Sequence, residues 1–154
     1  MAALLPFALL CALCVAVAWI DIRHGIIPDW LNLSIATLGL LRIFLIEDVW
    51  AAAGALGEGV IIGAVFWLLR RLYFKFRGIQ GLGLGDVKFL NAAGIWVGVA
   101  GIPMLLLVAT ITALACVGAV QLSGRTLTAQ TSMSFGPFLA IGLLATAGFQ
   151  QFGF

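Results

Sequence analysis

Two aspartates stand at the ends of apolar segments, where an ionisable side chain is costly unless it has a function or a partner. Asp21 follows the apolar run 4–20, and Asp86 precedes the uncharged run 89–122. If both carboxylates reach one site, they have the chemistry of an aspartic protease. One ionised carboxylate takes a proton from water, while the other, protonated, polarises the scissile carbonyl. The alternative is that each aspartate only caps a helix end near the lipid headgroups, which suits Asp86 better, because negative charge is favourable in a first turn and unfavourable after a last one.

Three glycines alternate within 81–85, directly before Asp86. Glycine permits positive φ and close backbone approach, as needed by a loop that receives an extended peptide beside a catalytic carboxylate. A protease acting at the membrane must unwind a helical substrate and pair with its exposed backbone. A flexible linker between helices is the plainer alternative, and the glycine pattern alone does not decide between them.

The composition indicates the kind of protein that carries these side chains. Of 154 residues, 64% are hydrophobic and 9% are charged, and the mean hydropathy is +1.21. A soluble domain has roughly a quarter charged residues, so the chain is predicted to be an integral membrane protein. The net charge of +2 excludes a nucleic-acid binder. A single membrane-embedded domain, 1–154, is expected.

Apolar stretches predict an all-α membrane protein with six transmembrane helices. They lie at 4–20, 31–46, 50–69, 84–100, 102–122 and 134–152. The run 89–122, helical throughout, would be about 51 Å long at ~1.5 Å per residue, which is too long for one span. We therefore expect a break at Gly101–Pro103. The span before that break must borrow residues upstream, which places Asp86 in the first turn of a spanning helix.

Basic residues gather in the loops after the first, third and fifth spans. They are Arg23, then Arg70, Arg71, Lys75 and Arg77, then Arg125. By the positive-inside rule, these loops are cytoplasmic and both termini are non-cytoplasmic. Asp21 and Asp86 then lie at the cytoplasmic face. A cleaved signal peptide is the alternative for 1–20, but the segment 1–3 lacks the basic residues of such a peptide.

Three segments resemble the type IV prepilin peptidases, which are GxGD-type membrane aspartic proteases. Residues 21–29 (Asp-Ile-Arg-His-Gly-Ile-Ile-Pro-Asp) are similar to the first catalytic motif of that family, and 83–88 (Gly-Leu-Gly-Asp-Val-Lys) match the second in full. Residues 134–140 (Ser-Phe-Gly-Pro-Phe-Leu-Ala) are similar to the segment that opens the last helix. The resemblance implies a short, single-domain member of the family.

The resemblance also implies roles for individual residues. Asp21 and Asp86 would be the catalytic pair. The remaining motif or substrate-loop positions would be Gly83, Gly85, Lys88, Pro28, Asp29, Gly136 and Pro137. The substrate would be a prepilin or pilin-like precursor, with a short leader before one apolar helix. Cleavage would occur at the cytoplasmic boundary of the inner membrane, in a multi-pass protein that needs no cofactor.

The sequence departs from the family at two places. Asp29 stands where the family usually has Asn, and we interpret it as the N-cap of the second span, a role that both residues fill. The long insert with paired zinc-binding cysteines of bifunctional members is absent, and Cys11 and Cys14 lie within the first span. No metal site and no methyltransferase activity are therefore expected.

Other functions remain as alternatives. A small proton-coupled transporter or channel would use membrane-embedded carboxylates as relays, but it would favour carboxylates staged across the bilayer. A protease of the signal-peptide-peptidase kind would place its aspartates deeper. Arg42 and Glu58, expected toward the opposite face, are interpreted as a structural pair or as snorkelling side chains. The basic cluster after the third span is expected to bind anionic membrane lipid.

Overall fold

The computed structural model describes residues 4–78, 82–122 and 134–153, and every regular element in these ranges is a helix. The elements are α1 (Leu4–His24), α2 (Asp29–Ile46), α3 (Val49–Arg77), α4 (Leu84–Leu122) and α5 (Gly136–Phe152). Within the described residues, α1, α2, α3 and α4 are long and apolar enough to cross a membrane. The prediction of an all-helical fold with several membrane-crossing helices is confirmed.

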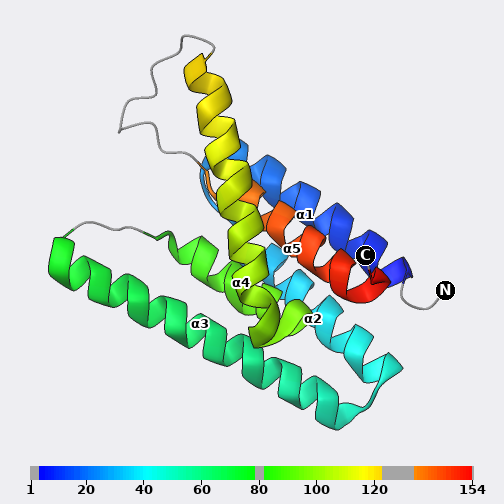
Figure 1. Ribbon diagram of the computed structural model, residues 1–154. Coiled ribbons are helices and arrows are strands. Elements are labelled where there is room, and N and C mark those ends of the chain that lie inside the picture. Colours follow the sequence, from blue (N-terminus) through cyan, green and yellow to red (C-terminus); the bar gives the residue numbers. More distant parts are fainter. Residues whose placement is uncertain (1–3, 79–81, 123–133, 154) are drawn as a thin grey trace.

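The long helix α4 is interrupted at Gly98, whose φ of 68° and ψ of 174° are not helical. Glycine tolerates this positive φ because it has no Cβ. The break frees backbone groups, and two of them find side-chain partners. Gln150 Nε2 donates to the Val97 carbonyl at 3.0 Å. The Val99 N–H donates to Glu58 Oε2 at 2.7 Å. Figure 1 shows the chain changing direction in this region, so α4 consists of two helical segments.

The predicted break at Gly101–Pro103 was therefore misplaced by a few residues, and the described chain contains five helical elements instead of six separate helices. Pro103 lies five residues after Gly98, inside the second segment, and the helix continues through it. The position of the break depends on Glu58 and Gln150, which come from two other helices. Local sequence signals do not contain that information.

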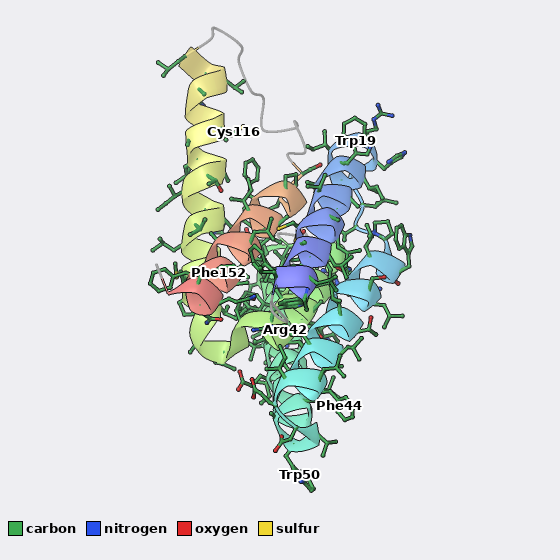
Figure 2. The ribbon with its side chains drawn as sticks, turned by 90° about the vertical axis from the view of Figure 1, so that its right-hand side faces the viewer. Trp19, Arg42, Phe44, Trp50, Cys116 and Phe152 are labelled. Atoms are coloured by element: carbon green, nitrogen blue, oxygen red, sulfur yellow. The ribbon has the colours of Figure 1, made fainter. Side chains whose placement is uncertain are left out.

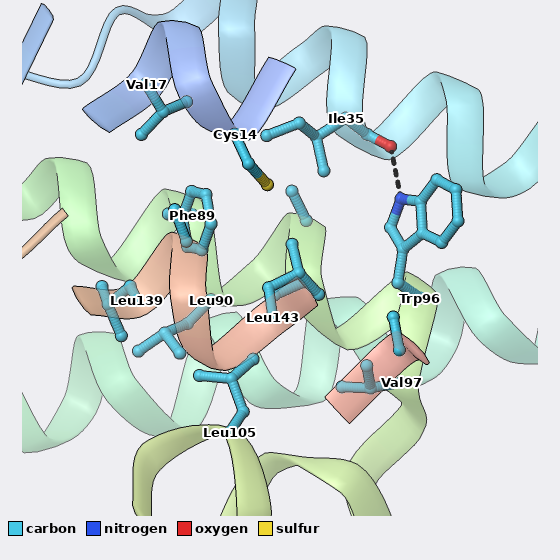
Figure 3. Close-up of a cluster of buried hydrophobic side chains, with 14 of the residues drawn as sticks. Cys14, Val17, Ile35, Phe89, Leu90, Trp96, Val97, Leu105, Leu139 and Leu143 are labelled. Atoms are coloured by element: carbon cyan, nitrogen blue, oxygen red, sulfur yellow. Dashed lines mark hydrogen bonds between the residues drawn. The ribbon is translucent and has the colours of Figure 1, made fainter. Parts of the chain in front are cut away.

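A core of apolar side chains joins α1, α2, α4 and α5 (Figure 3). On α1 the buried residues recur at helical spacing, at Leu10, Cys14, Val17 and Asp21. Asp21 thus continues the inward face of α1 rather than projecting into lipid. Trp96 on α4 lies in the same core, and its indole Nε1–H donates to the Ile35 carbonyl of α2 at 2.9 Å.

Small residues bring α3 and α4 close together. Gly59 and Gly63 are one turn apart on α3, and a Cβ at either position would lie within 3.0 Å of α4 atoms. In membranes, where burial of apolar surface does not drive helices together, such close backbone approach is the usual source of helix association. The close contact fixes α3 against the first segment of α4, which carries Asp86 in its first turn.

Four helix ends lie close together at one end of the molecule. The carboxyl end of α1 and the amino ends of α2, α4 and α5 all contribute residues to a single cavity there. Figure 2 shows Trp19 and Trp50 at opposite ends of the molecule. Tryptophans favour the two interfaces of a membrane, so this placement suits a bundle that crosses the bilayer.

Arg42 and Glu58 have separate partners. The Arg42 guanidinium lies over the Trp96 ring, with its carbon 5.4 Å from the ring centroid. Glu58 binds the Val99 N–H at the break of α4. No ion pair joins them among the described residues. Of the two structural interpretations drawn from the sequence, direct pairing was wrong.

Candidate active site

Asp21 occupies the last turn of α1 and is 5% exposed. Residues at the start of α5 donate hydrogen bonds to two groups of Asp21. The Gly136 N–H donates to the Asp21 carboxylate at 2.9 Å, and the Ser134 hydroxyl donates to the Asp21 main-chain carbonyl at 2.7 Å. Because the amino end of a helix carries partial positive charge, Gly136 offers this carboxylate a favourable partner. A Cβ at position 136 would lie 2.9 Å from the carboxylate carbon, so only glycine fits there.

Asp86 lies in the first turn of α4, as the length of the apolar run predicted. Its carboxylate lies against the Gly83 backbone, where the Gly83 N–H faces it and a Cβ on Gly83 would lie 2.9 Å from Asp86 Oδ2. The Val87 N–H donates to the Gly83 carbonyl at 3.3 Å, which makes Gly83 the N-cap of the helix. Asp86 is then the third helical residue, and a carboxylate at that position reaches back to the N-cap as in a capping box. The capping interpretation of Asp86 and the catalytic one thus coexist.

Both carboxylates face one cavity of about 860 Å³. They are close enough to interact electrostatically. The cavity is lined by Asp21, Gly25, Ile26, Ile27, Asp29, Leu82, Gly83, Leu84, Gly85, Asp86, Lys88, Ser134 and Phe135. Residues from distant parts of the sequence therefore line one partly polar cavity. Two carboxylates that act together on one substrate must share such a cavity.

Asp29 and Lys88 form an ion pair beside this cavity. Lys88 Nζ lies 2.7 Å from both carboxylate oxygens of Asp29. The pair joins the start of α2 to the start of α4, and both side chains line the cavity. The predicted N-cap role of Asp29 was wrong, because Pro28 is the N-cap of α2 and no side chain caps that helix. Asp29 is instead the first helical residue, where a carboxylate still favours the helix dipole.

The other motif residues lie around the same end of the molecule. A Cβ on Gly85 would lie 3.3 Å from the Ile27 Cβ, so the 83–88 segment packs closely on the turn between α1 and α2. Pro28 opens α2, with φ −63° and ψ 140°, and Pro137 lies in the first turn of α5. Neither proline lines the cavity. Their fixed φ suits the helix starts at which they stand.

Sequence reasoning did not single out Ser134 or Leu82, both of which line the cavity. Ser134 is the first residue of the recognised segment 134–140, but no role was predicted for it, and its bond to Asp21 joins positions 113 residues apart. No spacing rule predicts such a contact. His24, within the first motif, has Nδ1 3.3 Å from the Ile20 carbonyl of its own helix and is not a lining residue.

Metal ligands are not assembled in the described part of the chain. No group of three or more His, Cys, Asp or Glu side chains there could hold an ion. Cys14 is buried in the apolar core beside Val17, and Cys11 and Cys116 are free thiols. The polar groups that face the cavity are carboxylates, one ammonium, one hydroxyl and backbone groups, which can move protons and bind a peptide backbone.

The helices and the paired carboxylates define a polytopic helical membrane protein with a two-aspartate cavity. The profile of the type IV leader peptidase family matches residues 8–118, which include Asp21 and Asp86. The chain belongs to the type IV leader peptidase family. The resemblance seen in the three sequence motifs is thereby confirmed.

Curated relatives include proteins named prepilin leader peptidase/N-methyltransferase. The one from Burkholderia pseudomallei is 37% identical over 153 residues, which cover 96% of this chain and 47% of the relative. The one from Escherichia coli is 35% identical over 133 residues, which cover 84% and 56%. The one from Xanthomonas campestris is 34% identical over 128 residues, which cover 82% and 44%. The chain thus spans about half the length of these relatives. No solved structure matches it.

Proposed function

We propose that this protein is a membrane aspartic endopeptidase that removes the leader peptide of type IV prepilins or pilin-like precursors. The observation that carries the proposal is that Asp21 and Asp86, from distant parts of the sequence, face one cavity. Membership of the leader peptidase family and the names of the relatives support the same activity. A proton-coupled transporter is disfavoured, because its carboxylates would be staged across the bilayer.

The aspartates divide the chemistry between them. One carboxylate, which is ionised, accepts a proton from the attacking water while the water oxygen bonds to the scissile carbonyl carbon. The other, protonated, donates to the carbonyl oxygen and stabilises the tetrahedral intermediate. Collapse of the intermediate breaks the C–N bond, and the proton taken from water passes to the leaving amine. As the C=O bond of the new carboxyl group forms, the gem-diol returns a proton to the second carboxylate, which restores the pair. The backbone donors of Gly136 and Gly83 keep the two carboxylates in place during these steps.

The substrate is a precursor with a short leader ahead of one apolar helix. Its scissile peptide must be extended, since backbone groups inside a helix are already paired. Gly83 and Gly85 put no side chain into the cavity at their two positions of its wall, so an extended peptide can approach the backbone closely there. Lys88 and Asp29 frame the same cavity and belong to the substrate-binding segment in this proposal.

The proposed setting is the inner (cytoplasmic) membrane, crossed by six spans of a single domain, 1–154, with both termini outside the cytoplasm. The break at Gly98 supports six crossings, because it divides α4 into two segments. The basic residues near the ends of α1 and α3 support a cytoplasmic cavity. Methyl transfer, the second activity in the relatives' names, is not proposed for this chain, since the turn between α1 and α2 has no cysteine.

Processing of a prepilin by isogenic variants tests the function. Asp21→Asn and Asp86→Asn each remove an ionisable group and should lower the rate of leader removal by about 10²–10⁴-fold, the usual contribution of a general acid or base. Asp29→Asn is the matched control: it also lines the cavity, but its ion pair with Lys88 is exposed, and such pairs contribute only about 0–1 kcal/mol. We expect it to retain most activity.

The readout is the gel shift of a co-expressed precursor, with equal membrane levels of each variant confirmed by blotting. Full processing by Asp21→Asn or Asp86→Asn would refute the proposal. If Asp29→Asn is as inactive as the other two, the catalytic pair has been assigned wrongly.

A further inference from the structure

Arg70 continues the inward face of α3 beyond the apolar core. Buried and half-buried positions recur along that face at Gly59, Ile62, Gly63 and Phe66. Arg70 follows Phe66 by one turn. Among the α3 residues after Phe66, described through Arg77, Arg70 alone is not exposed. A cation is thus held inward at a point where the remaining side chains of the helix face outward.

The Arg70 side chain reaches the loop that precedes α4. Its Nε–H donates to the Leu82 carbonyl at 3.0 Å, in a part-buried position. Leu82 lines the two-aspartate cavity. The hydrogen bond therefore connects α3 to the wall of the candidate active site.

The Leu82 carbonyl and the Gly83 N–H belong to the same peptide group. That group is planar and, like every described peptide bond, not cis. Its carbonyl accepts from Arg70, and its N–H faces the Asp86 carboxylate, of which Oδ2 would lie 2.9 Å from a Cβ built on Gly83. Fixing the carbonyl on one edge consequently fixes the direction of the N–H on the other. A donor on the carbonyl also polarises the peptide and strengthens its N–H as a donor.

We propose that Arg70 is a positioning residue for Asp86, acting through the peptide group between Leu82 and Gly83. The proposal rests on the peptidase function proposed above, because it assigns Arg70 to the same reaction. Arg70 touches neither substrate nor carboxylate in this role. It holds the backbone donor that orients the carboxylate toward water.

Arg71 provides a matched comparison. It is the next residue on α3, carries the same charge and is exposed, with its guanidinium carbon 5.2 Å from the Trp67 ring centroid. It is not a lining residue of the cavity. If the basic cluster serves only to bind anionic lipid, substitutions at Arg70 and at Arg71 should have the same effect on leader removal. If the hydrogen bond to Leu82 matters, they should differ.

Three substitutions at Arg70 separate the donor from the charge. The amide nitrogen of glutamine stands the same number of bonds from Cα as arginine Nε, so Arg70→Gln keeps the donor and loses the charge. Arg70→Lys keeps the charge and puts a methylene group at that position. Arg70→Met keeps only the length and apolar bulk.

Leader removal is measured on purified protein in detergent, with kcat and KM determined separately and folding monitored by thermal unfolding. Arg70→Met and Arg70→Lys should lower kcat by about 10²-fold with little change in KM, because a misplaced catalytic group slows chemistry more than binding. Arg70→Gln should recover most of the lost kcat, and Arg71→Met should match the unchanged protein. Arg70→Lys keeps the test decisive if Arg70→Met fails to fold.

Three results would overturn the proposal, and the first two are a normal kcat in Arg70→Lys and a kcat of Arg70→Gln as low as that of Arg70→Lys. Equal losses in Arg70→Met and Arg71→Met would also contradict it and favour a role in lipid binding. None of these results touches the proposed function, which fails only if Asp21→Asn or Asp86→Asn stays active.

Discussion

Two regions of this molecule place an acidic side chain against a backbone N–H near the start of a helical segment. They differ in the other groups that surround the carboxylate. At the break of α4, Glu58 accepts from Val99. At the cavity, Asp21 accepts from the Gly136 N–H, and the Asp86 carboxylate lies against the backbone of Gly83. Gly136 and Gln150, the α5 residues that touch the two regions, are 14 residues apart (150 − 136), or about 21 Å at ~1.5 Å per residue.

The difference lies in the surroundings of the carboxylates. Glu58 is a single acidic group beside a backbone that needs capping, and Gln150 satisfies the freed carbonyl beside it. Asp21 and Asp86 come as a pair, and both face an open cavity. A helix-capping contact therefore does not exclude function. A second carboxylate and access to water distinguish the catalytic candidates from the structural one.

Gly136→Ala should produce the largest effect in a test of this comparison. Its Cβ would lie 2.9 Å from the Asp21 carboxylate carbon and displace it, so leader removal should fall by about 10²-fold. Gly148→Ala on the same helix is the control, because its Cβ would make only an ordinary 3.5 Å contact with Phe7. Processing assays on equal amounts of membrane protein measure both. Normal activity in Gly136→Ala would mean that the contact with Asp21 does not position it.

Gly98→Ala should have a smaller effect, on stability rather than on chemistry. With φ 68° and ψ 174°, Gly98 has a backbone conformation that is essentially restricted to glycine, and a Cβ there costs about 1–3 kcal/mol. That Cβ would also lie 2.7 Å from Glu58 Oε2. We expect a lower midpoint of thermal unfolding in detergent, with residual kcat close to that of the unchanged protein. Gly54→Ala, with open space around its Cβ, should leave the midpoint unchanged. A large loss of kcat in folded Gly98→Ala would show that the two regions are coupled.

The sequence predicted much of this architecture because its strongest signals are local. Apolar runs located the helices, and the length of the run 89–122 placed Asp86 in a first turn, as observed. The contacts that complete the site are not local. The bonds from Ser134 to Asp21 and from Lys88 to Asp29 join positions 113 and 59 residues apart. Even the shift of the break to Gly98 depends on Glu58, 41 residues before its partner Val99.

The same distinction between local signals and non-local contacts applies to the candidate site. Asp21, Asp86 and the glycines before Asp86 could be identified from residue type and position. The N-cap role predicted for Asp29 was wrong because Pro28 is the N-cap of α2, and the sequence could not show that Lys88 would pair with Asp29. Arg70 was grouped with the other basic residues of its loop because only the fold shows it turning inward.

The most direct test of the central claim is a cross-link between positions 21 and 86 in native membranes. Cysteines replace both aspartates after Cys11, Cys14 and Cys116 have been changed to alanine, and a short thiol-specific cross-linker is added. A control pair places cysteines at positions 21 and 58, at the two separated regions. We predict efficient cross-linking of the 21–86 pair and none of the control. Absence of a 21–86 cross-link, with both thiols reactive toward a monofunctional reagent, would contradict a shared catalytic cavity.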